Sequence, residues 1–472
     1  MEYLNRILGQ LHRNGDFNFH PKCRKLNCTH VCFADDLLMF CRADTISIQI
    51  LHQAFLKFSK ASGMKANPSK SAIYLAGVKQ EFRTEMIGRL GFSEGTLPFR
   101  YLGIPLDSKK ISIHQFLPLI ERITARITCW SAKLLSYAGR CQLKKSVFFG
   151  IQSYWSQVFI LPKRVQKAID TICRTFLWTG SASSSRRALV AWDRICTPLN
   201  AGGLNIMNLT IWNKAAIAKL LWDLARKKDC LWVRWVHCYY IKRADIETVN
   251  APKQAAWVVR KIIQCRDVIM ENQQLIGSLS DRLKTVCCLG KFQIHKLYIA
   301  MLPRFDRVIW RNLLLVANVI PRHKFIVWLA AQHRLPTVDR LAKFGIQIPP
   351  MCVFCNKQEE TFQHLYFDCC ITKSLWSRIC CWMGSPRQIL DWENELKWIC
   401  SKARSHAWRN AITAAAFIHV IALVWKARNN MRFQNLAYDE DKTAREIALL
   451  IHIRGRHSRS WKIGLQQLNS FP

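Results

Sequence analysis

Two adjacent acidic residues, Asp35 and Asp36, interrupt an otherwise apolar run from His30 to Phe40. The flanks are each long enough for a β-strand and contain neither Gly nor Pro, so the run predicts a β-hairpin with both aspartates at its tip. A bare pair of carboxylates is costly to bury unless a cation or several donors meet it. Such oxygen ligands suit Mg²⁺, and two Mg²⁺ ions can hold the attacking and leaving oxygens of a phosphoryl transfer. The alternative is an Asp-Asp turn that only joins two core strands.

Two further motifs follow the hairpin in a fixed order. The segment Phe33-Ala34-Asp35-Asp36 is succeeded by Ser62-Gly63-Met64-Lys65-Ala66-Asn67-Pro68-Ser69-Lys70-Ser71 and then by Phe99-Arg100-Tyr101-Leu102-Gly103-Ile104-Pro105-Leu106. Together the three motifs resemble the aromatic-x-Asp-Asp box, the Gly-Leu-x-x-Asn-x-x-Lys-Ser segment and the Tyr-Leu-Gly primer grip of reverse transcriptases. The resemblance is to the polymerases of non-LTR (long interspersed element) retrotransposons, and most closely to the plant type.

This resemblance implies roles for individual residues. Asp35 and Asp36 would be catalytic Mg²⁺ ligands, and Mg²⁺ would be a cofactor only of the intact polymerase. Lys70 would contact a substrate phosphate, although from spacing alone it could equally be a solvated lysine at the start of a strand. The turn that supports the primer end would be formed by Tyr101, Leu102 and Gly103. Deoxynucleotides would be the only small-molecule substrates.

The charge balance points to a polyanionic partner. The chain has 472 residues with 70 Lys and Arg against 31 Asp and Glu, a formal net charge of +39. So large an excess predicts binding to nucleic acid, RNA and DNA, and the alternative is scattered, solvated charge. The 20 Cys without a secretory signal argue against a disulfide framework, so we expect an intracellular protein, nuclear or cytoplasmic, that is not secreted. The apolar run Ala411–Trp425 is too short to span a bilayer, so we expect a buried helix and no membrane partner.

Three basic residues, Arg140, Lys144 and Lys145, lie along one predicted helix. The stretch Leu134–Ser146 is similar to the family's Leu-Ser-x-Ala-Gly-Arg segment in the polymerase thumb. There such side chains would face the backbone of a nucleic-acid duplex, because Lys and Arg displace counterions from phosphates. The alternative is a solvated basic face.

A second constellation of polar residues has the spacing Cys-x2-Cys-x8-His-x4-Cys. Its members are Cys352, Cys355, His364 and Cys369, with Cys370 as an alternative to Cys369. Three sulfur ligands and one nitrogen ligand satisfy tetrahedral Zn²⁺ and leave no open position for water, so the pattern predicts a structural zinc site. The alternative is a set of reduced, buried Cys and His residues. The surrounding residues resemble the zinc-binding domain that follows plant non-LTR reverse transcriptases.

These patterns predict an α+β protein with a partial palm hairpin and sheet, followed by a largely helical thumb, a connector and a small zinc module. The expected domains are a distal palm fragment (1–110), a thumb-like helical region (111–200), a helical connector (201–290), the reverse transcriptase zinc-binding domain (291–376) and a basic helical C-terminal region (377–472).

The resemblance implies a remnant of an RNA-directed DNA polymerase that binds nucleic acid and zinc. The family's first catalytic aspartate and its fingers would precede Met1, so we expect the isolated chain to be inactive. The alternative is a non-enzymatic, zinc-dependent nucleic-acid-binding protein. A degenerate open reading frame of the element, without a selected role, is a third interpretation.

Overall fold

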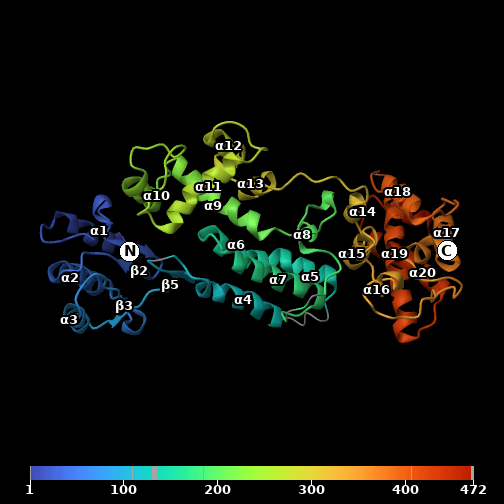
Figure 1. Ribbon diagram of the computed structural model, residues 1–472, viewed down its shortest axis with the longest axis horizontal. Helices are drawn as coiled ribbons and strands as arrows, with labels where there is room; N and C mark the ends of the chain where they lie inside the picture. The colour runs from blue at the N-terminus through green and yellow to red at the C-terminus, as the bar shows by residue number, and fades with distance from the viewer. Residues whose placement is uncertain are drawn as a thin grey trace. The chain divides into compact units, whose positions relative to one another are not determined.

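The computed structural model describes residues 2–108, 110–129, 135–183, 185, 187–405 and 407–468. The described chain is mostly α-helical, and its strands form only short two-stranded sheets (Figure 1). The predicted α+β class is therefore confirmed. The chain divides into two compact units, each built from separated segments of sequence.

The first unit comprises Met1–Phe116, Trp155–Leu161 and Ile211–Met301. Its N-terminal elements are α1 (Glu2–Gln10), β1 (His30–Phe33), β2 (Asp36–Met39), α2 (Thr45–Ser62), β3 (Ala72–Ile73), α3 (Gln80–Leu90), β4 (Ser93–Glu94), β5 (Phe99–Tyr101) and β6 (Ile104–Leu106). Its later elements are α9 (Leu209–Ala225), whose first two residues belong to the second unit, α10 (Leu231–Val236), α11 (Trp257–Met270), α12 (Leu279–Thr285), β7 (Cys287–Cys288), β8 (Lys291–Phe292) and α13 (Ile294–Ala300).

Helix α2 has the boundaries that local sequence signals dictate. The side chain of Asp44 accepts a hydrogen bond from the amide of Ser47 at 2.8 Å and so caps the first turn. Gly63 ends the helix in the left-handed conformation, with φ of +72°, which glycine adopts without steric cost. The buried face of α2 packs against α1 in a small core that includes Leu4, Leu8, Leu51 and Phe58. This core holds the helices beside the β1–β2 hairpin.

The second unit comprises Leu117–Tyr154, Pro162–Thr210 and Leu302–Pro472. Its earlier helices are α4 (Leu117–Cys129), α5 (Tyr137–Leu143), α6 (Phe149–Val158), which continues into the first unit, α7 (Lys163–Thr179) and α8 (Trp192–Ile195). Its later helices are α14 (Arg311–Leu315), α15 (Pro321–Ala330), α16 (Val338–Ala342), α17 (Cys370–Trp382), α18 (Trp392–Lys402), α19 (Trp408–Gln434), α20 (Glu440–Gly455) and α21 (Lys462–Gln467). Residues 130–134 lie outside the described residues, and they include Leu134, the first residue of the predicted thumb motif.

One hydrophobic core runs through the second unit and is centred on α19. In Figure 1, α15, α17, α18 and α20 surround this helix. Side chains from both sides of the predicted boundary at 376/377 share the core, among them Trp328, Trp376, Trp392 and Phe417. The predicted zinc-binding segment and the predicted C-terminal region thus share one core, and the division between them stays a prediction. The apolar face of the zinc-binding segment is covered by helices that follow it in sequence.

Helix α19 is long and apolar enough, by length and composition, to cross a membrane. However, 78% of its most apolar window is buried inside the protein. Its residues from Ile412 to Trp425 are all buried, as expected for a core helix.

Candidate functional site

A tight turn of the chain places the side chains of Cys352 and Cys355 on the same side of the backbone. The amide of Cys352 donates to the carbonyl of Gln358 at 2.8 Å, and the amide of Asn356 donates to the carbonyl of Cys352 at 2.9 Å. Asn356 has a φ of +52°, a conformation that Asn tolerates better than most residues. A bridge between Met351 and Glu359 closes the turn. Both thiols consequently point toward one centre.

The other two members of the cluster come from the chain segment that leads into α17. Cys369 is the N-cap residue of this helix, and its amide donates to the carbonyl of His364 at 2.8 Å. Between them, Phe367 has a φ of +81°, which is strained for a bulky residue and is held by burial of its ring. The reversal at Phe367 brings Cys369 back beside His364.

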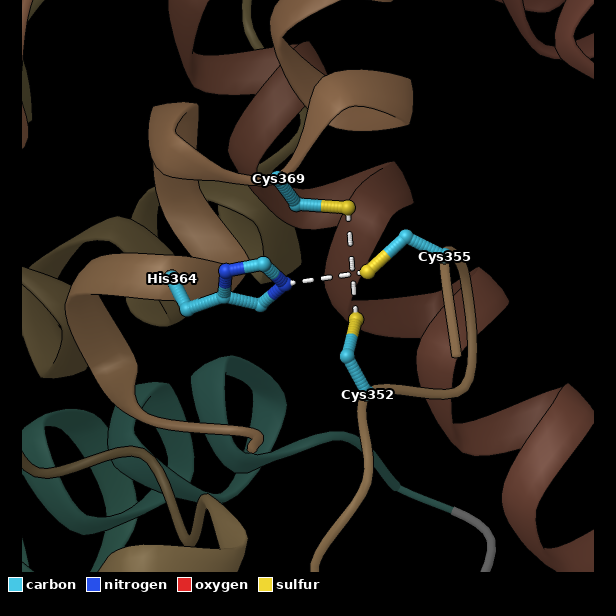
Figure 2. A group of neighbouring side chains, drawn as sticks. All are labelled: Cys352, Cys355, His364 and Cys369. Atoms are coloured by element: carbon cyan, nitrogen blue, oxygen red, sulfur yellow. Dashed lines mark hydrogen bonds between the residues drawn. The ribbon is translucent and has the colours of Figure 1, made fainter. Parts of the chain in front are cut away.

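The four ligand atoms form a compact group, all within 4.8 Å of one another (Figure 2). The sulfur atoms of Cys352 and Cys369 lie 3.9 Å apart, and the Cys355 sulfur lies 3.2 Å from His364 Nε2. Zn–S bonds of about 2.3 Å and Zn–N bonds of about 2.0 Å require tetrahedral edges of about 3.8 Å between sulfurs and about 3.5 Å between sulfur and nitrogen. The donor set and its spacing therefore fit a Zn²⁺ ion.

The hydrogen bond between the Cys352 and Cys369 thiols lowers the pKa of Cys352 and raises the pKa of Cys369, so the surroundings favour the thiolate form at Cys352. The hydrogen bond with the Cys369 thiol, and then the backbone N–H groups of Cys355 and Phe354, lower the pKa of Cys352 to about 5. Cys352 and Cys369 are fully buried and His364 is nearly so. Cys370 is exposed and lies outside the group, so Cys369 is the member that the fold supplies.

The hairpin that carries Asp35 and Asp36 has a two-residue turn formed by Ala34 and Asp35. Asp36 is the first residue of β2 and pairs with Phe33, so only one aspartate occupies the turn itself. Both carboxylates are exposed, and the Phe33 side chain is 59% exposed. The flanks are therefore strands, as predicted, but not core strands. Their side chains have no second sheet layer against them in the described residues.

The predicted primer-grip residues lie at the tip of a second hairpin, where Tyr101 ends β5 and Leu102 and Gly103 form the turn to β6. Leu102 and Gly103 have φ values of +50° and +80°, the combination of a type I′ turn. Partial burial and then the negative charge of Asp36 raise the pKa of Tyr101, so this ring lies within electrostatic reach of the acidic hairpin. Lys70 ends a 3₁₀ turn (Pro68–Lys70) and is exposed.

The structure corrects the expectation for two of the three basic thumb residues. Arg140 is 7% exposed, and its guanidinium donates to the carbonyl of Leu177 at 3.3 Å. Lys144 is 4% exposed, and its Nζ donates to the side chain of Gln152 at 2.9 Å. Arg140 faces the interior because α5 packs against α7, and Lys144, which opens the π-helical turn Lys144–Phe148, is held by Gln152 of α6. Neither charge is placed to contact a phosphate. Lys145 is partly exposed, and its contact with the backbone of a nucleic-acid duplex stays a prediction.

Sequence reasoning missed a buried charge network beside the zinc-type cluster. Glu360, Arg428 and Arg432 form it, and the Glu360 side chain is completely buried. Arg432 also donates to the carbonyls of Pro349 and Met351, which precede Cys352. The available signal was the spacing of the two arginines, four residues apart at the end of an otherwise apolar helix.

Comparisons with known proteins agree with this geometry. Residues 2–106 match a family model described as reverse transcriptase (RNA-dependent DNA polymerase), and residues 292–376 match one described as zinc-binding in reverse transcriptase. A protein of Arabidopsis thaliana named for ribonuclease H is 33% identical over 129 residues, which are 27% of this chain and 21% of that protein. An uncharacterized mitochondrial protein of the same plant is 21% identical over 140 residues, which are 29% of this chain and 90% of that protein. The chain thus spans about a fifth of the first relative.

Proposed function

We propose that this chain, which resembles the C-terminal part of a plant-type non-LTR retrotransposon reverse transcriptase, binds nucleic acid and holds a structural zinc ion. The observation that carries the proposal is the convergence of Cys352, Cys355, His364 and Cys369 within the segment that matches the zinc-binding family model. The net charge of +39 and the match of residues 2–106 to a polymerase family support an RNA or DNA partner.

The zinc ion would have a structural role. Three thiolates and one imidazole fill all four positions of a tetrahedron, so no position is left for a substrate or an activated water. Bound zinc would supply the attraction that fixes the Cys352–Cys355 turn against the start of α17. Most of the free energy of binding would then stabilise the fold of this segment.

The acidic hairpin would act together with the other parts of a polymerase. Asp35 and Asp36 would hold Mg²⁺, which supplies charge neutralisation at the phosphates when it is bound. Tyr101, Leu102 and Gly103, on the neighbouring hairpin, would support a primer end, and Lys70 would contact a phosphate. Among the described residues, no third His, Cys, Asp or Glu joins the two aspartates to form a larger metal-binding group. This observation favours the second candidate function, in which the isolated chain binds nucleic acid without catalysis.

Binding measurements test the first part of the proposal. We expect purified chain to bind oligonucleotides of different sequences with similar affinity. Affinity should fall by orders of magnitude between about 50 and 200 mM salt, because counterions are released from several phosphates. Affinity that does not change over this range, or no binding at low salt, would refute nucleic-acid binding through the charge of the chain.

Primer extension separates the two candidate functions. With an RNA template, a DNA primer, deoxynucleotides and Mg²⁺, we expect no templated extension by the chain alone. Two exposed carboxylates do not hold a pair of ions in the geometry that in-line phosphoryl transfer needs. Templated extension that disappears in the Asp35→Ala variant would show that the chain is a polymerase by itself.

A further inference from the structure

The second unit contains a cavity of about 430 Å³ at the surface beside α16. Phe344 lies on its wall and is 69% exposed, so the face of its ring is open to a ligand. The wall also includes Arg334, Asp339 and Lys343. A cavity of this volume is in the range that accommodates a small organic group such as a nucleobase with its sugar.

The charges around this cavity are mostly positive. Arg334, Arg340 and Lys343 contribute three cations against the single carboxylate of Asp339. The guanidinium of Arg340 is held by the carbonyls of His333 and Leu189. Arg334 and Lys343 are exposed and donate no side-chain hydrogen bond to another described residue. Both are therefore available to an anionic ligand.

One carboxylate oxygen of Asp339 has no hydrogen-bond donor among the described residues. Its Oδ1 is shielded from solvent and accepts no hydrogen bond from any described residue. Asp339 lies on the cavity wall, and a carboxylate has two acceptor oxygens, so an N–H group of a ligand in the cavity can donate to this side chain. The exocyclic amino groups and ring N–H groups of nucleobases are donors of this type, and carboxylates pair with them in known complexes.

A second cavity, of about 510 Å³, shares Arg334 with the first. Arg194, Trp310 and Gln332 also lie on its wall. Arg334 therefore lies between the two cavities. This arrangement suits a phosphate that connects two successive nucleotides of a flexible strand.

The wall of the first cavity is built by residues that lead directly into the zinc-type cluster. Thr361 and Phe362 lie on the wall, and the hydroxyl of Thr361 accepts a hydrogen bond from the amide of His364 at 3.0 Å. The Phe362 ring is buried and packs against those of His333 and Trp392, with centroids 4.4 and 5.0 Å apart. The cavity wall and the zinc-type cluster therefore share the segment 361–364.

We propose that the two cavities form a binding site for single-stranded nucleic acid. One unstacked base lies against the ring of Phe344 and donates to Asp339, while Arg334 and Lys343 contact the phosphates. A duplex does not fit this description, because its bases are stacked on one another and cannot cover an isolated aromatic ring. The inference rests on the proposed function, to which it adds the form of nucleic acid and the residues that recognise it.

Fluorescence of a 2-aminopurine-labelled single-stranded oligonucleotide tests the site, with a duplex of the same sequence as the comparison. We expect the full chain to quench the probe and Phe344→Ala to weaken single-strand binding by about fivefold or more, because one stacking contact is lost. Phe344→Tyr should restore both binding and quenching. Lys343→Ala should lower the slope of binding affinity against salt concentration by the amount that corresponds to about one phosphate contact. Lys357 is an exposed lysine of the same segment outside the cavity, so Lys357→Ala should leave quenching unchanged.

Two outcomes distinguish failure of this inference from failure of the proposed function. If Phe344→Ala quenches the probe and binds single strands like the unsubstituted chain, while salt-sensitive binding persists, the site is refuted and the proposed function stands. If the unsubstituted chain binds neither form of nucleic acid at low salt, both are refuted. Zinc content and thermal unfolding of each variant would show that the fold is retained, as expected for substitutions of exposed side chains.

Discussion

Arg428 and Glu360 form an ion pair that is almost completely removed from water. The Nε of Arg428 donates to both carboxylate oxygens of Glu360, at 3.0 and 3.1 Å, and each residue is 1% exposed. The same carboxylate accepts hydrogen bonds from Arg432 at 2.9 Å and from the amide of Val338 at 3.2 Å. Through this one side chain, α19 is joined to the segment between Cys355 and His364 and to the start of α16.

Removing the charge of Glu360 should therefore strongly destabilise the folded protein. We expect Glu360→Gln to lower the free energy of unfolding by about 3–5 kcal/mol, because it leaves buried guanidinium groups without their carboxylate. The neighbouring Glu359 is exposed, so Glu359→Gln is a matched control that should change stability by less than about 0.5 kcal/mol. Denaturant unfolding measures both, and equal stabilities of the two variants would contradict the structural role of the pair.

Measurement of the zinc content should distinguish the role of Cys369 from that of Cys370. Cys369→Ser should abolish stoichiometric Zn²⁺ binding, and Cys370→Ser should retain it, because only Cys369 lies in the cluster. A chelator should also lower the melting temperature of the unsubstituted chain, since metal binding stabilises the folded state. Metal analysis must use the full chain, because α19 supplies much of the core against which residues 292–376 pack. Full zinc content in Cys369→Ser would refute the proposed ligand set.

Substitution of Arg140 should change the stability of the protein, whereas substitution of Lys145 should change its binding of nucleic acid. Arg140→Ala should lower stability by about 2–4 kcal/mol, because a buried side chain and its bond to the carbonyl of Leu177 are lost. Lys145→Ala should change stability by less than about 0.5 kcal/mol and weaken binding of all oligonucleotide sequences about equally. Unfolding and binding curves for the two variants test this. An unaltered stability of Arg140→Ala would restore the original expectation that Arg140 faces a phosphate backbone.

A buried histidine pair should make the second unit sensitive to acid. His323 on α15 and His419 on α19 approach through their Nδ1 atoms at 2.8 Å. Burial, followed by the charges of Arg322, Lys426 and Arg454, lowers the pKa of His323 to about 4. Burial, followed by the proximity of His323 and Arg454, lowers the pKa of His419 to about 3. Both imidazoles are therefore neutral in the folded protein near neutral pH.

The direction of the pH dependence follows from proton uptake. In the unfolded chain each histidine has its ordinary pKa of 6.5 and takes up a proton below that pH, whereas the folded state does not until about pH 4. Stability is thus highest above pH 6.5 and falls on acidification, by up to about 1.4 kcal/mol per pH unit for each histidine. The variant with both His323→Leu and His419→Leu should show a shallower decline between pH 6.5 and 4. The exposed His457 provides the control His457→Gln, and an unchanged slope in the double variant would refute the assignment.

The sequence by itself determined the features that depend on residues near one another in the chain. The Cys-x2-Cys-x8-His-x4-Cys spacing, the Asp35–Asp36 hairpin, and the capping of α2 by Asp44 and Gly63 all follow from local turns and hydrogen bonds. Such interactions span only a few residues, so their pattern is visible before the chain folds. The α+β class follows in the same way from short strand and helix signals.

Only the tertiary structure decided which charges are buried and which segments share a core. Arg140 and Lys144 lie on a stretch whose sequence allowed a solvated face, but Arg140 is buried where α5 packs against α7, and Lys144 is buried beside Gln152 of α6. Glu360 and Arg428 are separated by 68 residues, and α19 covers a segment that precedes it by a comparable distance. Burial is a property of the neighbours that long-range packing brings together, and the free energy of a charge depends on those neighbours. The spacing of Arg428 and Arg432 is a local pattern, but the carboxylate that they meet comes from a distant segment of the chain.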